Sequence, residues 1–253
     1  MGEEPIGAGI GRGGVSPLRL LAALCLPLIL GGCGVEEYIY FYPPTTNSNP
    51  VLSIAPLEFS HNSSNDSSTF LGYEVYYLLV DESNTTFLSE CSSKVDAYIG
   101  TKTPSELIAA IKSLGFKPLV GFTSSDDSSV MNTFPLFLIG TAGLSQDIDF
   151  DVNINDEGTV VVSGDGASEV TAPHHVRRNS KNSSSEYRSF GNLKEDDVGS
   201  DGDTAYASAE PATVLFRGYV FGYGTTASWG EVFSVPVRVG DSDEPALSGS
   251  FDE

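Results

Sequence analysis

The chain has 253 residues, of which 40% are hydrophobic. This is enough apolar material for one large domain or two small ones. Asp and Glu outnumber Lys and Arg by 34 to 13, which gives a formal net charge of -21. This charge repels phosphate backbones and argues against a nucleic-acid partner. The acidic excess favours solubility, with a specific cation-binding role as the alternative. Many turn-forming residues among Val, Ile, Phe and Tyr predict a mainly β protein of short strands and loops.

An apolar run, Leu20–Leu30 (LLAALCLPLIL), directly follows Arg19 near the N-terminus. It is too short to cross a bilayer, which takes about twenty residues, and it fits the apolar region of a secretory signal. The run ends in Leu30-Gly31-Gly32-Cys33, an aliphatic residue and two small residues before a cysteine. This pattern resembles the lipobox of bacterial lipoproteins, which are cleaved before the cysteine and receive a diacylglycerol on its thiol.

The resemblance implies a signal peptide over 1–32, cleavage between Gly32 and Cys33, and a lipidated tether over 33–50 that fixes the protein to a membrane. Mature lipoproteins of this class carry three acyl chains, enough for firm anchoring. In the family's sorting rule an Asp after the cysteine retains the protein at the inner membrane. Gly34 stands there, which favours the outer membrane. The alternative is an ordinary secretory signal cut near Gly32, with Cys33 unmodified.

Two further N-terminal features bear on function. Gly9–Gly14 fits G-x-G-x-x-G, but Gly- and Pro-rich residues precede it and Ser16-Pro17 follow, where a dinucleotide site needs a strand and a helix. Removal of Cys25 with the signal and lipidation of Cys33 would leave Cys91 without a disulfide partner. We expect Cys91 to be a small buried thiol, with a reactive nucleophile as the alternative.

A β-rich domain is predicted over 51–240. Strands are expected at 51–59, 70–81, 116–123, 130–140, 146–155, 159–163, 213–224 and 231–239, while 86–98 is ambiguous. The strand at 146–155 alternates strictly, so that Ile148 and Phe150 face one way and Asp149 and Asp151 the other. The turn after it predicts a hairpin with 159–163.

A helix is predicted at about 104–114. Thr103 and Glu106 form a capping box, with Pro104 at the first helical position. Gly115 supplies the stop. Further along, the polar segment 172–210 predicts a long disordered loop that contains a basic island from His174 to Lys181. Residues 241–253 are expected to be an acidic disordered tail.

Two stretches resemble a fibronectin type III domain. Gly72–Tyr77 (GYEVYY) is similar to that family's third strand, and Phe216–Gly224 with Phe233–Val239 is similar to its last two strands. The resemblance implies an Ig/fibronectin-type-III-like sandwich with the helix at about 104–114 and the hairpin inserted. Phe59 would take the place of the family's core tryptophan.

The order C-G-V-x-x-Y-x-Y-x-Y-P-P, followed by F-x-G-Y-E-V-Y-Y, also resembles uncharacterised spirochaete envelope lipoproteins. That similarity runs from Cys33 to about Leu79. It implies a place in the cell envelope and no particular activity.

Candidate chemistry is sparse. Asp147, Asp149 and Asp151 project from one strand face and are weak candidates for calcium, against a simple solvated face; no EF-hand spacing is present. G-x-S-x-G, H-E-x-x-H and C-x-x-C do not occur in the sequence, so we predict no catalytic residues, zinc site or cofactor. An aromatic surface for sugar or peptide is a further hypothesis, against core packing, with the residues Tyr38, Tyr40, Tyr42, Tyr219, Tyr223 and Trp229.

The sequence therefore predicts an envelope lipoprotein, periplasmic or surface-facing, that acts as a non-catalytic binding or structural module on a lipid tether. Its partner would be an envelope or extracellular protein or a glycan. The alternatives are an envelope hydrolase acting on glycan or peptide, and a calcium-dependent adhesion-like module.

Overall fold

A computed structural model describes part of the chain as one compact unit that begins at Ile39. The described residues are 39–46, 57–65, 67–124, 129–154, 158–181, 186–190, 193, 197, 202–205, 214–226 and 230–239. The predicted signal peptide, Cys33 and the acidic tail lie outside these residues.

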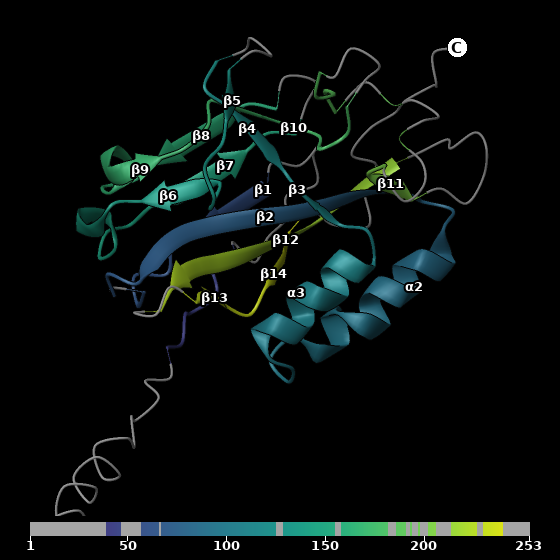
Figure 1. The fold of residues 1–253 in the computed structure, drawn as a ribbon, viewed down its shortest axis with the longest axis horizontal. Helices are drawn as coiled ribbons and strands as arrows, with labels where there is room; N and C mark the ends of the chain where they lie inside the picture. The colour runs from purple at the N-terminus through teal and green to yellow at the C-terminus, as the bar shows by residue number, and fades with distance from the viewer. Residues whose placement is uncertain are drawn as a thin grey trace, which may run out of the picture. The chain divides into compact units, whose positions relative to one another are not determined.

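Two long antiparallel strands form the centre of this unit: β2 (Phe70–Asp81) and β12 (Val214–Thr225) (Figure 1). Both are rich in Val, Tyr and Phe, which suit a pleated surface buried on both sides. Successive side chains point to opposite faces. Val75, Tyr77 and Leu79 therefore enter one apolar core, and residues such as Tyr76 and Val80 enter a second.

Short strands complete the central sheet. β6 (Phe137–Ile139) pairs with β2 and β9 (Val170–Thr171), while β13 (Glu231–Phe233) and β14 (Val237–Val239) pair with β12. β3 (Lys117–Pro118) and the parallel β11 (Thr204–Ala205) pair with β2. Gly72 allows β6 to approach, because it has φ of 150° and a Cβ there would lie 1.8 Å from the Phe137 carbonyl oxygen.

Two three-stranded sheets lie on the side of the first core. One consists of β1 (Leu57–Ser60), β7 (Asp149–Val152) and β8 (Val160–Ser163), and the other of β10 (His175–Arg177), β4 (Val120–Phe122) and β5 (Val130–Met131). The predicted hairpin is confirmed, since β7 and β8 pair antiparallel and Ile148, Phe150 and Val152 are buried. Phe59 stacks on Phe150 with ring centroids 4.7 Å apart.

Two helices cover the opposite face of β2 and β12 (Figure 1). α3 (Pro104–Ser113) confirms the predicted helix, with the expected capping box and with Leu107, Ile108 and Ile111 buried. α2 (Thr85–Lys94), which precedes it, was not predicted; Asn84 caps it through a 3.1 Å hydrogen bond to the Phe87 amide. Short 3-10 turns follow at η1 (Asp96–Tyr98), η2 (Thr141–Gly143) and η3 (Ala167–Glu169).

The described part of the chain is thus mainly β, as predicted, and its antiparallel sheets are accompanied by two helices where one was expected. Two predicted strands are broken in the structure. The stretch 116–123 forms β3 and β4, and 130–140 forms β5 and β6 around Pro135, which has no N–H to donate to a ladder.

The prediction of a disordered loop over 172–210 is wrong for the described part of that segment. β10 and β11 lie within it, and Val176, Phe190 and Leu193 are buried in the first core. The basic island is also split, since Arg178 is fully buried and His174 is exposed. The segment is anchored by buried charges that the sequence alone did not reveal.

Candidate functional site

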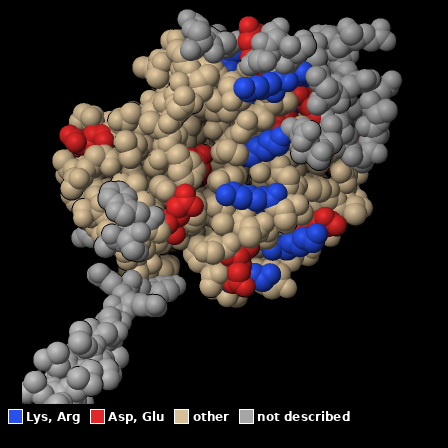
Figure 2. Space-filling model, viewed as in Figure 1, with Lys and Arg blue, Asp and Glu red and all other residues tan. Residues whose placement is uncertain are grey.

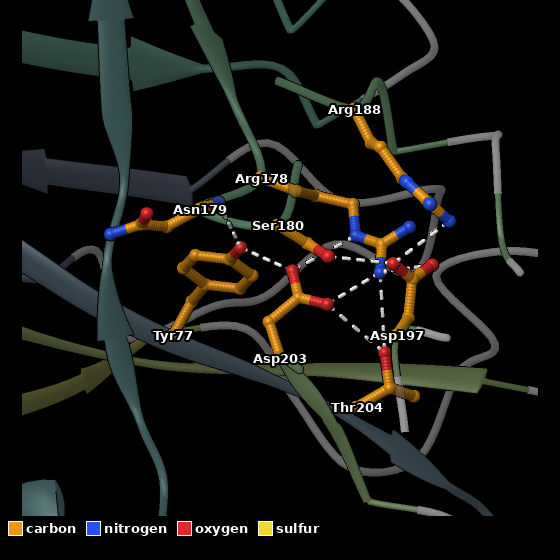
Figure 3. Close-up of polar contacts among 8 residues, drawn as sticks. All are labelled: Tyr77, Arg178, Asn179, Ser180, Arg188, Asp197, Asp203 and Thr204. Carbon is orange, nitrogen blue, oxygen red and sulfur yellow. Dashed lines mark hydrogen bonds and ion pairs between the residues drawn. The ribbon is translucent and has the colours of Figure 1, made fainter. Parts of the chain in front are cut away.

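The largest cluster of buried polar side chains in the described structure joins β2 to the segment that follows β10 (Figure 3). Tyr77 lies in the middle of β2 and faces the first core. Arg178 comes directly after β10, and Asp203 comes directly before β11. The Leu79 amide donates to the Asp203 carbonyl at 3.0 Å, which places the Asp203 side chain beside Tyr77.

Arg178 is the centre of this cluster. Its Nε donates to Asp203 Oδ2 at 3.0 Å and its Nη2 to Asp203 Oδ1 at 2.5 Å, the parallel arrangement that a guanidinium and a carboxylate favour. The same Nη2 lies 2.8 Å from Asp197 Oδ2. Arg188 Nη1 lies 3.0 Å from Asp197 Oδ1, so two arginines and two aspartates are linked in one chain of ion pairs.

Neutral groups complete the cluster. The Tyr77 hydroxyl donates to Asp203 and accepts from the Asn179 amide at 2.5 Å. The Thr204 hydroxyl donates to Asp203 at 3.2 Å, and the Ser180 hydroxyl donates to Asp197 at 2.6 Å. Figure 3 shows these side chains converging from separate stretches of the chain on the two carboxylates.

The surroundings of Arg178 and Tyr77 shift the pKa of both side chains. Burial alone would lower the pKa of Arg178, but its hydrogen bonds to Asp203 and the charges of Asp203 and Asp197 raise that pKa above its usual value. Burial, and then the Asp203 charge, raise the pKa of Tyr77 well above its usual value. Tyr77 therefore stays a neutral hydrogen-bond donor at physiological pH.

Such an arrangement holds the chain together and does not suit catalysis. The side chains of Arg178, Asp197 and Asp203 have no exposed surface, so none of them can reach a substrate or exchange a proton with bulk water. The cluster acts as a non-covalent cross-link between β2 and the segment 178–204. Breaking one member of such a buried pair leaves an uncompensated charge, which typically costs about 3–5 kcal/mol.

A second polar cluster lies at the edge of the helical core. Asp96, in η1, accepts a hydrogen bond from Arg217 and one from the Tyr219 hydroxyl at 2.8 Å, and it lies 3.4 Å from Arg238 Nη1. It joins the helical segment to β12 and β14. Cys91 lies in the same core and is fully buried, as predicted; burial raises the pKa of its thiol to about 11, so it remains protonated.

His61 is also a buried structural residue. Its Nε2 lies 2.8 Å from the Leu144 carbonyl, which can only accept, so Nε2 carries the proton. Nδ1 then accepts from the Tyr73 hydroxyl at 2.9 Å, and that hydroxyl accepts from the Asn62 amide at 3.0 Å. Burial lowers the pKa of His61, which favours the neutral ring that this network requires.

The predicted carboxylates lie on the outer side of the hairpin. Asp147 and Asp149 are exposed and Asp151 is half-buried. Asp149 accepts from the Ser60 hydroxyl at 2.6 Å, and Asp151 lies opposite Glu58 in the neighbouring strand. Among the described residues, no three His, Cys, Asp or Glu side chains are grouped as a metal site would require.

The predicted aromatic surface is wrong in part. Tyr219 and Tyr223 are buried in the sheet, so they cannot present their rings to a ligand. Tyr40 and Tyr42 are 50% and 45% exposed, with an edge-to-face contact at 5.2 Å between ring centroids. Tyr38 and Trp229 lie outside the described residues, as do the predicted cleavage and lipidation residues Gly32 and Cys33.

Charge on the surface is uneven. On the face in Figure 2 the Lys and Arg side chains follow one another in a row, with carboxylates scattered beside them. Several cations of the protein lie over aromatic rings, such as Lys112 over Tyr76 at 5.4 Å and Lys102 over Tyr98 at 3.8 Å. These two lysines are therefore engaged in local contacts.

Comparison with known proteins identifies no relative. No family model matches the chain, and neither the curated proteins nor the solved structures contain a significant match. Within the described residues, no helix is long and apolar enough to cross a membrane.

The Arg178 cluster was not predicted from the sequence, although one signal was present. Val176, Phe190 and Leu193 are isolated apolar residues in an otherwise polar segment, and all three are buried. Apolar side chains at such intervals indicate contact with a core. Arginines beside them must then be paired with acids.

Proposed function

We propose that the protein is a lipoprotein of the bacterial cell envelope, anchored through Cys33, whose β-rich domain is a non-catalytic binding or structural module. The single observation that carries this proposal is the sequence Leu30-Gly31-Gly32-Cys33 at the end of an apolar run that follows Arg19. Gly34 after the cysteine favours the outer membrane over the inner membrane.

The nature of the buried clusters supports a non-catalytic module. Arg178, Asp203 and Tyr77 satisfy one another in the interior, and His61 is held neutral between Tyr73 and the Leu144 carbonyl. These buried polar side chains are therefore occupied in holding the fold. Recognition would then fall to the loops and to the exposed edges of the sheets, with an envelope protein or glycan as partner.

For the fold we further propose an Ig/fibronectin-type-III-like sandwich with α2, α3 and the β7–β8 hairpin as insertions. The pairing of β2 with β12, and of β12 with β14, supports this, because these are the three strands that resemble adjacent strands of that family. Phe59 is buried and stacks on Phe150, which supports its role in place of the family's tryptophan.

The anchor is tested by growing cells with labelled palmitate and comparing the wild type with Cys33→Ala and Cys25→Ala. We expect label and membrane association in the wild type and in Cys25→Ala, and the loss of both in Cys33→Ala. Cys25→Ala is the matched control, since that residue lies within the predicted signal.

An unlabelled wild-type protein in the soluble fraction would overturn the proposal. So would a Cys33→Ala protein that keeps the label, since the acyl chains would then lie on another residue.

A further inference from the structure

The first buried residue of the described domain lies very close to the proposed anchor in the sequence. Phe41 is buried in the first core and packs edge-to-face on Phe70 at 5.2 Å, only eight residues after Cys33. Eight residues span at most about 28 Å when fully extended. A lipid on Cys33 would therefore keep Phe41 within that distance of the bilayer surface.

The two exposed tyrosines flank Phe41, and the backbone on the Tyr42 side is hydrogen-bonded to a neighbouring loop. The Tyr42 amide donates to Asn65 Oδ1 at 2.7 Å, and the Asn65 side-chain amide donates back to the Tyr42 carbonyl at 2.9 Å. The Asn62 side chain donates to the Pro43 carbonyl at 3.2 Å. Phe41 is buried between the two tyrosines and the backbone of Tyr42 and Pro43 is hydrogen-bonded, so the fold keeps Tyr40 and Tyr42 at the surface.

The described residues that bond to or pack on the segment around this tyrosine pair are uncharged. Asn65 contacts Tyr42, and Gly224 approaches the Phe41 ring so closely that a Cβ there would lie 2.5 Å from it. The Thr225 amide donates to the Thr69 carbonyl, which joins the two neighbouring loops. The described residues 39–46, 61–65 and 67–69 contain no Asp, Glu, Lys or Arg, whereas the exposed Glu231 pairs with Thr225 beside them.

We propose that this end of the domain, with Tyr40 and Tyr42 at its centre, rests on the lipid headgroups of the membrane that holds the anchor. The inference depends on the proposed lipidation of Cys33. A tyrosine has an apolar ring and a polar hydroxyl, which suit the boundary between acyl chains and water. A short tether keeps the effective concentration of this end at the headgroups high.

The consequence is a defined orientation. The tyrosine end faces the bilayer, and the opposite end of the β2–β12 pair, near Asp81 and Val214, points away from the membrane toward a partner.

The test uses the full chain, purified from membranes after palmitate labelling and reconstituted in vesicles of phosphatidylethanolamine and phosphatidylglycerol. A photo-crosslinking phenylalanine analogue replaces Tyr40 in one sample and Tyr98 in another. Tyr98 is the matched control, because it is 40% exposed and lies on the helical side of the sheet. We expect phospholipid adducts, identified by mass, to be at least about fivefold more frequent at position 40.

Each result is decisive. Labelled protein with equal adducts at both positions, or none at position 40, would overturn the orientation and leave the anchor intact. Adducts at position 40 with a second copy of the chain or another protein would also overturn it. Unlabelled protein would overturn the lipoprotein proposal itself, and the orientation with it.

Discussion

Glu74 is a buried carboxyl group, and its burial disfavours the ionised form of the side chain. It lies in β2, opposite Phe221, and accepts a hydrogen bond from the Leu136 amide at 2.9 Å. Burial raises the pKa of Glu74 to about 8, because the hydrogen bonds from the Leu136 and Val75 amides offset only part of the desolvation. At neutral pH the group is mostly protonated in the folded state and ionised in the unfolded chain.

The sign of the pH effect follows from proton counts. Between about pH 4.5 and 8 the folded state binds more protons than the unfolded chain, so the contribution of Glu74 to stability falls as pH rises. Glu74→Gln keeps the acceptor for the Leu136 amide and removes the ionisation. We expect this variant to be more stable than the wild type at pH 8, by up to about 5 kcal/mol at ~1.4 kcal/mol per pKa unit. Urea denaturation across pH 5 to 8.5 measures the difference.

The matched control for that experiment is Glu58→Gln, an exposed carboxylate in β1. Its pH profile should follow the wild type over the same range. If Glu74→Gln also followed the wild type, Glu74 would not be the group that senses pH.

Substitution of Tyr77 tests how much the buried cluster around Arg178 contributes to stability. Tyr77→Phe keeps the ring that stacks on Phe216 at 5.6 Å but removes the donor to Asp203 and the acceptor of the Asn179 amide. Leaving buried polar groups without partners costs about 1–3 kcal/mol each, and more where a charge is involved. We therefore expect a loss of at least about 2 kcal/mol in the free energy of unfolding, measured in urea.

Tyr98→Phe removes a hydroxyl from an exposed ring and should change stability by less than about 0.5 kcal/mol. Equal effects in the two variants would mean that the Tyr77 hydroxyl contributes nothing beyond an ordinary surface group.

The partners within this cluster could not be predicted from the sequence. Asp203 follows Asp201, and Asp197 follows Asp196, in a stretch dense with acids. No local pattern distinguishes the aspartates that meet Arg178 from their neighbours, because the choice depends on the pairing of β11 with β2. By contrast, the outward position of Asp149 and Asp151 followed from the alternation alone.

At the level of elements, α3 depends on its N-terminal cap. The Thr103 hydroxyl accepts from the Glu106 amide, and the Glu106 carboxylate accepts from the Thr103 amide at 3.0 Å. Thr103→Ala removes the acceptor, and loss of such a cap costs about 1 kcal/mol. Thermal unfolding should show a lower midpoint for Thr103→Ala.

Ser105→Ala is the control, because Ser105 is exposed two residues further along the same helix. This change should leave the midpoint nearly unaltered. An equal fall in both variants would point to the general sensitivity of the helix and away from its cap.

Elements with strong local signals were predicted well, and elements that depend on distant contacts were not. β2 and α3 agree with their predicted bounds within a residue because Tyr and Val runs, caps and Gly stops are local. α2 has no comparable signal: its sequence is TTFLSECSSK, and Cys91 is its only fully buried residue. β10 and β11 were missed because each is two or three residues long and is stabilised by strands far away in the sequence.

For the whole molecule, charge is the dominant global property. A net charge of -21 destabilises the compact state through repulsion among carboxylates. Salt screens such exposed charges, with a Debye length of about 10 Å at 0.1 M, whereas the buried Arg178 pairs are affected little. We expect the melting temperature at pH 7 to rise by several degrees, on the order of 5 °C, between 20 and 300 mM NaCl.

The control is the same titration close to the sequence pI of about 4.2, where the net charge is small. There the salt effect should nearly vanish. An equal rise at both pH values would show that ion-specific effects, and not repulsion, are responsible.

The pairing of β2 with β12 also governs when the protein can fold. The two strands pair along nearly their whole length although more than a hundred residues separate them in the chain. Because both cores are built on this pair, neither can close until the C-terminal part of the chain has arrived. A chain threaded through an export channel from its N-terminus would therefore remain unfolded, and so able to pass, until almost all of it has crossed.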